Sequence, residues 1–107
     1  PDSLDAVNQL AWTLATAPDD RFRNGPEATE VARALEKDES NSIYLDTVAA
    51  VRAENGLWDE AIEWEQKAIT AAHKASQPAR VQEFRQRLAN YQQKQPYRTL
   101  APSAPSK

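Results

Sequence analysis

The spacing of small and large apolar residues between Leu45 and Ala68 constrains the fold of this chain more than any other feature. Ala49 and Ala61 stand on either side of Gly56, and Ala68 follows Ala61 by seven residues. Small side chains at a helix contact let two backbones approach closely, and a glycine between two helices permits the left-handed residue that ends the first one. The segment therefore predicts two short antiparallel helices, which favours a stacking unit over a catalytic pocket.

Apolar residues recur at intervals of three and four along most of the chain, as they do in helices with one buried face. The pattern predicts helices over residues 4–17, 26–35, 43–54, 58–74 and 77–95. We expect Leu10 in the buried stripe of the first helix, and Glu83 paired with Arg87 on the outer face of the fifth. No segment alternates with a period of two, so the predicted class is all-α without a sheet.

The first half of the chain repeats the second with a longer loop. The second helices of the two halves correspond at an offset of 33 residues and the first helices at an offset of 38, so the first hairpin has five more residues between its helices. The corresponding pairs are Ala28 with Ala61, Leu35 with Ala68, Leu10 with Val48, and Ala11 with Ala49.

The unit that begins at Leu45 resembles the tetratricopeptide repeat, whose signature is W-x2-L-G-x2-Y, then A-x3-F, then P over 34 residues. Residues 45–52 match the first part with substitutions, Gly56 takes the place of the inter-helix glycine, and Ala61 and Ala68 match the two close-approach alanines. Arg52, Glu65 and His73 depart from the pattern, and Trp64 is expected to supply the bulk missing at position 65. A lengthened first loop is similar to that of modules in large bacterial multidomain proteins.

The resemblance implies a right-handed helical-hairpin repeat fold. Its two repeats cover about residues 4–40 and 42–75, and a capping helix covers about residues 77–95. Together they form one predicted domain over residues 1–97. A tail rich in proline, alanine and serine, at residues 98–107, is expected to be disordered.

The resemblance also implies a concave groove along the first helix of each repeat, which would accept an extended peptide or a helix of a partner protein. Trp12 points away from Leu10 and Leu14, so it either anchors such a peptide or packs on the fifth helix or on an element that precedes this sequence. The acidic side chains favour a neutral or basic partner segment. The implied groove residues are Asp5, Asn8, Trp12, Ile43, Asp46, Ala50 and Glu54.

The sequence offers little for catalysis, so we expect no enzyme activity and no catalytic, cofactor or metal residues. His73 is the only histidine and lies at a predicted helix end, where a cation is favourable. Asp19 and Asp20 are adjacent in a loop, where such residues usually form turns with their own backbone. Cysteine is absent, so neither a disulfide nor a thiolate metal site can form.

The charge and composition of the chain limit the classes of partner that it is expected to bind. The chain has 107 residues and a net charge of −3, which disfavours nucleic acid and anionic membrane surfaces. The expected function is that of an interaction scaffold, with a second possibility that it is a spacer or homodimerisation domain of a larger multidomain protein, for example in signalling. Because methionine is absent even at position 1, we expect a piece of a longer protein. The compartment stays open, with a cytoplasmic location favoured.

Overall fold

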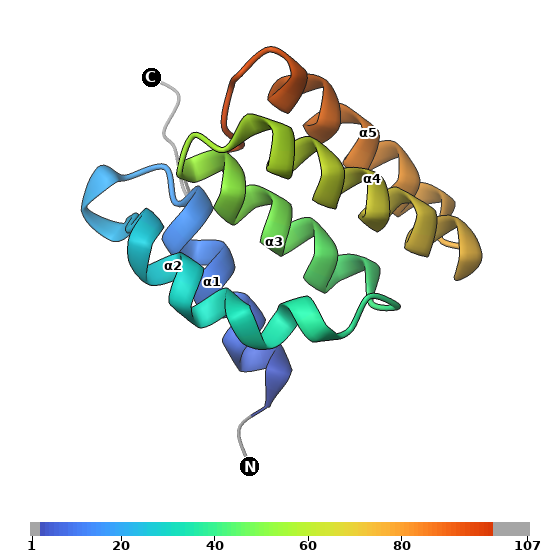
Figure 1. Ribbon diagram of the computed structural model, residues 1–107, viewed down its shortest axis with the longest axis horizontal. Helices are drawn as coiled ribbons and strands as arrows, with labels where there is room; N and C mark the ends of the chain where they lie inside the picture. The colour runs from blue at the N-terminus through green and yellow to red at the C-terminus, as the bar shows by residue number, and fades with distance from the viewer. Residues whose placement is uncertain (1–2, 100–107) are drawn as a thin grey trace, which may run out of the picture.

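The computed structural model describes residues 3–99 and contains five α-helices (Figure 1). No strand occurs between residues 3 and 99, so the predicted all-α class is confirmed for this range. Short 3-10 helices at Asp20–Phe22 and Arg33–Lys37 lie in the connections. The α-helices are α1 (Leu4–Thr16), α2 (Gly25–Ala32), α3 (Ser42–Glu54), α4 (Trp58–Lys74) and α5 (Pro78–Gln92).

Polar side chains cap the first three helices. The Ser3 side chain accepts from the amide of Asp5 at the start of α1, and Asn24 does the same for Glu27 in α2. At the start of α3, Asn41 accepts from two successive backbone amides. These caps satisfy amide groups that have no partner inside a helix, so they determine where each helix begins.

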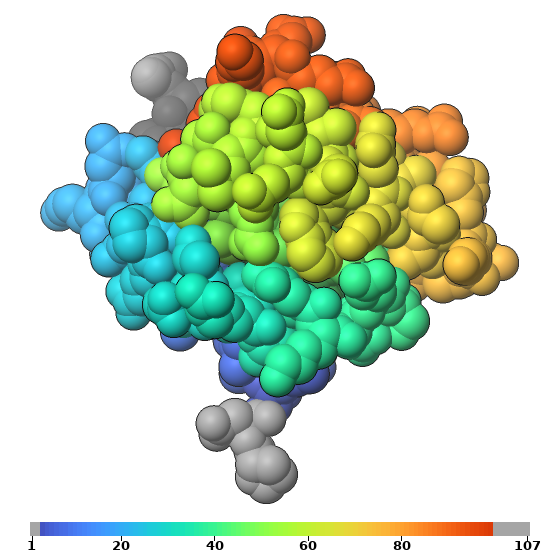
Figure 2. All heavy atoms as spheres, viewed as in Figure 1, coloured from blue at the N-terminus to red at the C-terminus, as the bar shows by residue number. Residues whose placement is uncertain are grey.

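Helix α3 is the centre of the domain. It packs against α1 and α2 on one side and against α4 on the other, and α5 packs on α4. In Figure 1, α3 and α4 lie side by side and run in opposite directions, and in Figure 2 their side chains fill the middle of the face between α2 and α5. Ten of the thirteen residues of α3 are buried.

Alanine forms most of the close helix contacts, as the sequence pattern predicts. Ala11 and Ala28 are fully buried in one cluster around α1, α2 and α3. Ala49 and Ala61 are fully buried in a second cluster between α3 and α4. Such small side chains allow short distances between helix axes, because no bulky group holds the backbones apart.

The prediction for Leu10 is wrong, because this side chain is 48% exposed. Helix α1 uses Ala11 and Ala15 for its contacts with the core, and both are buried. The alanine contact turns the face of α1 that carries Leu10 away from α2 and α3, so a large apolar side chain is left at the surface.

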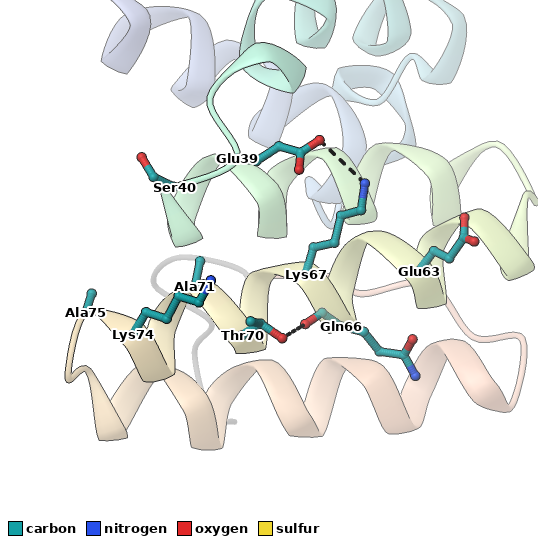
Figure 3. A pocket seen from close by; sticks show the side chains of 9 residues that line it. All are labelled: Glu39, Ser40, Glu63, Gln66, Lys67, Thr70, Ala71, Lys74 and Ala75. Carbon is teal, nitrogen blue, oxygen red and sulfur yellow. Dashed lines mark hydrogen bonds and ion pairs between the residues drawn. The ribbon is translucent and has the colours of Figure 1, made fainter.

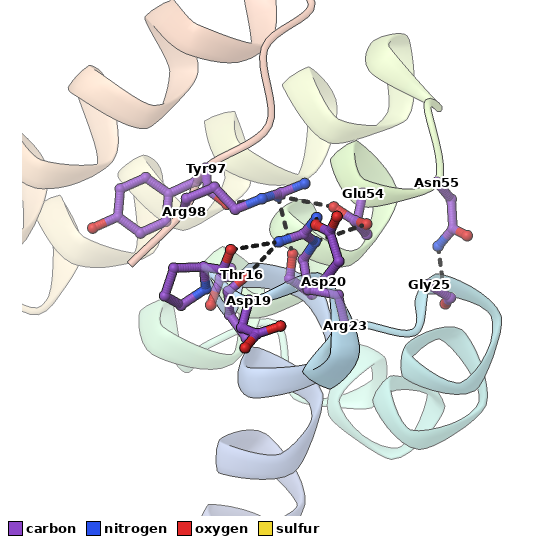
Figure 4. Close-up of polar contacts among 12 residues, drawn as sticks. Thr16, Asp19, Asp20, Arg23, Gly25, Glu54, Asn55, Tyr97 and Arg98 are labelled. Carbon is purple, nitrogen blue, oxygen red and sulfur yellow. Dashed lines mark hydrogen bonds and ion pairs between the residues drawn. The ribbon is translucent and has the colours of Figure 1, made fainter. Parts of the chain in front are cut away.

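A close approach joins the start of α2 to the end of α3. The side-chain amide of Asn55 donates to the carbonyl of Gly25 at 3.1 Å and to the Thr29 hydroxyl at 3.1 Å (Figure 4). A Cβ at Gly25 would lie 2.5 Å from the Asn55 side-chain oxygen. A side chain at position 25 would therefore displace Asn55 from this contact between the two halves of the chain.

The chain reverses after α5. Lys94 adopts a left-handed conformation with φ of 60°, and the amide of Gln95 donates back to the carbonyl of Asn90 at 2.9 Å. Residues 95–99, which we call the C-terminal strap, then return towards the end of α1. Arg98 and Thr99, which begin the predicted tail, make contacts described below, and residues 100–107 of that tail lie outside the described residues.

Gly56→Ala is expected to lower the free energy of unfolding by about 1 kcal/mol, measured by urea denaturation. Gly56 has φ of 76°, and a Cβ there would meet no atom within 4 Å, so the cost comes from the backbone alone. The reverse change at the end of α4 is the control: Ser76 has φ of 57°, and Ser76→Gly is expected to raise stability. Unchanged stability in Gly56→Ala would contradict this account of the turn.

Candidate functional site

A hollow of about 200 Å³ lies between α1, α3 and α5. Its lining includes Asn8 and Trp12 from α1 and Ile43 and Asp46 from α3, which are four of the seven predicted groove residues. We call this hollow the groove. Its other lining residues are Gln9, Thr47, Arg80, Glu83, Phe84 and Arg87.

The other three predicted groove residues lie outside this hollow. Asp5 accepts a hydrogen bond of 2.7 Å from the Tyr44 hydroxyl, and Ala50 is buried in the core. Glu54 lies at the far end of α3, and its carboxylate is held between two arginines. These three residues lie on α1 and α3, as predicted. Their side chains do not line the hollow, because each packs or pairs with a neighbour elsewhere.

Arg87 crosses the groove and is the main feature that the sequence analysis missed. Its guanidinium group is 2.5 Å from Asp46 Oδ2, and its central carbon lies 5.0 Å from the centre of the Trp12 ring. The expected Glu83–Arg87 pair on the outer face is wrong, since the Arg87 side chain is 14% exposed. Arg87 follows Phe84 by three residues, which puts it next to the buried stripe of α5. This spacing was the sequence signal that could have placed Arg87 inside.

Beneath this ion pair lies a buried carboxyl group. Glu65 is fully buried in α4, and neither of its oxygens accepts a hydrogen bond from a donor within residues 3–99. Burial raises the pKa of Glu65 well above its ordinary value, and the charge of Asp46 adds to the rise. Burial also raises the pKa of Asp46, and the Arg87 charge partly offsets that effect.

These effects are consistent with a single proton on the carboxyl pair. A proton on Glu65 would remove one buried negative charge beside Asp46, whose carboxylate is paired with Arg87. Tyr91 is also fully buried, and burial near these carboxyl groups raises its pKa far above the ordinary value. Its ring fills the space between α3, α4 and α5 beside the cluster. A buried polar cluster of Asp46, Glu65 and Arg87 thus lies behind the groove, and one oxygen of Asp46, both oxygens of Glu65 and the Tyr91 hydroxyl lack a hydrogen-bond partner within residues 3–99.

The C-terminal strap covers the end of the groove nearest the C-terminus of α1. The Tyr97 ring packs on the Trp12 ring with centres 5.6 Å apart, and the Arg87 guanidinium carbon lies 4.6 Å from the Tyr97 ring centre. Trp12 is thus packed against Arg87 of α5, and α5 is one of the packing partners that the sequence left open for it. Tyr97 and Trp12 form an aromatic pair, and the Arg87 guanidinium group lies over both rings. Contacts between aromatic rings and between a cation and a ring both stabilise this arrangement.

The strap is also hydrogen-bonded to α1. The amide of Thr99 donates to the carbonyl of Thr16 at 3.0 Å. Arg98 Nη1 lies 2.9 Å from Glu54 Oε1, and Arg23 approaches the same carboxylate from the other side, with Nε 3.4 Å from Oε2 (Figure 4). The strap therefore joins the ends of α1 and α3, which are 83 and 44 residues away from it in the sequence.

The other surface features have fewer contacts between buried side chains. A wider hollow of about 800 Å³ lies between the turn before α3 and the outer face of α4, where Lys67 is 3.6 Å from Glu39 (Figure 3). Its charged side chains are largely exposed. Asp19 accepts from the amide of Arg21 at 2.9 Å, as expected of a turn-forming residue. Within residues 3–99, no cluster of three or more acidic, histidine or cysteine side chains has the geometry to hold a metal ion, and no helix is long and apolar enough to cross a membrane.

Comparisons with known proteins give no match: no family model fits the chain, and neither a curated protein nor a solved structure is significantly similar to it.

Glu65→Gln is expected to flatten the dependence of stability on pH. A carboxyl group whose pKa is higher in the folded state binds a proton on folding, so its contribution is complete below the unfolded pKa of about 4.3 and is lost as pH rises towards the folded value. Above pH 4.3 the unchanged chain therefore loses up to about 1.4 kcal/mol per pH unit relative to Glu65→Gln. Urea unfolding between pH 4 and pH 8 measures the difference.

The control for this experiment is Glu63→Gln, on the exposed face of the same helix. It is expected to leave the pH profile of the unchanged chain intact. Parallel profiles for the unchanged chain and Glu65→Gln would contradict a proton held at Glu65.

Proposed function

We propose that this chain is a tetratricopeptide-like scaffold module with two helical hairpins and a capping helix, and that it binds an extended segment of a partner protein. The observation that carries the proposal is the groove, which gathers Asn8, Trp12, Ile43 and Asp46 between three helices. Support for the repeat comes from the order of the helices and from the alanines at their contacts. The helix that begins at Pro78 would serve as the cap.

The chemistry of the groove suits a peptide rather than a small substrate. Trp12 and Ile43 offer apolar contact area, and Ile43 is 36% exposed. The side-chain oxygen of Asn8 is buried beside the groove and has no hydrogen-bond partner within residues 3–99, so it is an acceptor whose hydrogen-bonding capacity is unused. The two acidic side chains that line the groove, Asp46 and Glu83, are matched in number by two arginines, and Arg87 neutralises Asp46, so the groove favours a segment with little net charge.

A second candidate function is self-association through the outer side of α1. Leu4 is 39% exposed, Leu10 is 48% exposed, and Phe22 in the following loop is 59% exposed. Large apolar side chains on one side of a helix favour a partner surface when they are contiguous. Light scattering over a range of concentrations tests this candidate, and a Leu10→Glu variant is expected to dissolve a dimer formed by this surface.

Ile43→Glu is expected to weaken peptide binding at least tenfold. The change puts a carboxylate on the apolar wall of the groove, where a bound segment would remove it from water. The measurement uses an array of synthetic 12-residue peptides of neutral and basic composition, followed by fluorescence polarisation of those that the unchanged chain binds.

The matched control is Leu57→Glu, because Leu57 is a similarly exposed apolar residue at the opposite end of α3. This variant is expected to bind the same peptides with unchanged affinity. Equal binding by the unchanged chain and Ile43→Glu would contradict the placement of the peptide site in the groove.

A further inference from the structure

The end of α1 presents backbone acceptors that an extended peptide can use. Helix α1 stops before Pro18 without a left-handed glycine, so its last carbonyl groups need partners from outside the helix. The carbonyl of Thr16 accepts from the Thr99 amide at 3.0 Å and from the Thr99 hydroxyl at 3.3 Å. The acceptor is a backbone carbonyl, so any extended segment that places an amide at this position could donate the same hydrogen bond.

The side chains of the strap enter two different environments, as neighbouring residues of an extended segment do. Tyr97 points to the groove and packs on Trp12, with Arg87 beside it. Arg98 points the other way, to the carboxylate of Glu54 at 2.9 Å, and its Nη1 lies 3.5 Å from the carbonyl of Ala15 (Figure 4). One environment is aromatic and the other is acidic.

The surroundings of Arg98 favour a guanidinium group. The Glu54 side chain is 17% exposed, so its charge is poorly solvated, and it lies near the negative end of α1. The contacts of Arg98 with Glu54 and Ala15 both come from Nη1, and the side chain is only 31% exposed. A guanidinium group is more weakly hydrated than an ammonium group, so it costs less to hold at this partly buried position.

We propose that the C-terminal strap is an intramolecular ligand of the groove, and that the partner segment accepted there has the same chemistry, an aromatic side chain followed directly by an arginine in an extended backbone. The inference rests on the proposed peptide-binding function and names the class of its ligand. The partner segment replaces Tyr97 on Trp12 and Arg98 on Glu54. A partner segment therefore binds only if its affinity for the groove is high enough to displace the strap.

Tethering makes the strap a strong competitor. A short flexible link gives the attached segment an effective concentration of the order of millimolar. The strap follows α5, which ends at Gln92, and Tyr97 also packs against the core cluster that contains Tyr91. A free peptide with micromolar affinity for the open groove is therefore outcompeted in the unchanged chain. Removal of the strap side chains should restore that affinity.

The test uses the full 107-residue chain with Tyr97→Ala and Arg98→Ala combined, and a fluorescein-labelled synthetic copy of residues 94–99 as the probe. Fluorescence polarisation is expected to show the probe binding at least tenfold more tightly to this variant than to the unchanged chain. Alanine in place of the tyrosine or the arginine of the probe is expected to abolish the gain. Arg85→Ala, which removes an exposed arginine of α5, is the matched control and leaves the affinity unchanged.

A second measurement does not depend on the stability of the variant. In the unchanged chain, the Thr99 amide is hydrogen-bonded to Thr16 and should exchange slowly with solvent. Millimolar probe is expected to displace the strap and to accelerate exchange at Thr99, while amides in the middle of α3 keep their protection. A probe with the arginine replaced by lysine is expected to displace less of the strap at the same concentration.

Three results would overturn the inference. The first is equal probe affinity for the unchanged chain and the double variant, with unaltered exchange at Thr99. The second is a concentration-dependent dimer that the double variant dissolves, because the occupant would then be a second copy of this chain. The third is that groove-dependent peptides from the array lack an aromatic–arginine pair, in which case peptide binding stands and the assigned ligand class fails. If no peptide binds either form, the proposed function fails as well.

Discussion

The ion pair between Arg87 and Asp46 is the interaction on which the arrangement of this domain depends. It attaches α5 to α3, although the two helices are separated in the chain by the whole of α4. Asp46 is only 4% exposed, so a carboxylate there without Arg87 would be buried and uncompensated. The same guanidinium group lies against Trp12 and Tyr97. One side chain thus contacts α3, the groove wall and the strap from its place on α5.

The buried cluster around this pair favours one arrangement over alternatives rather than adding much stability. Glu65 is fully buried beside Asp46, and this burial raises the pKa of Glu65 well above its ordinary value. Apolar residues of similar volume often stabilise a core as well as a buried ion pair does, but they specify less about which partner each helix takes. Here α3, α4 and α5 each contribute one member, so the cluster is complete only in a single packing of the three helices.

The groove follows from the sequence only in part. Asn8 and Trp12 share a face of α1 because they are four residues apart, and Ile43 and Asp46 share a face of α3 because they are three apart. The period of a helix is local, so these pairs can be recognised before any tertiary structure is known. Arg87 was mispredicted because Glu83, four residues earlier, offered a plausible pair on the same helix. The contact that Arg87 makes instead, with Asp46, spans 41 residues.

The sequence by itself determined the helices and the alanine contacts between them, because caps, breaks and the spacing of small residues act over a few positions. It also indicated which faces of α1 and α3 line a groove. Only the tertiary structure decided what occupies the space around those faces. The return of the chain at Lys94 brings Tyr97 onto Trp12 and Arg98 onto Glu54, contacts between residues more than 40 positions apart. No local periodicity encodes such contacts, since they form only when α5 is packed and the strap reaches the end of α1.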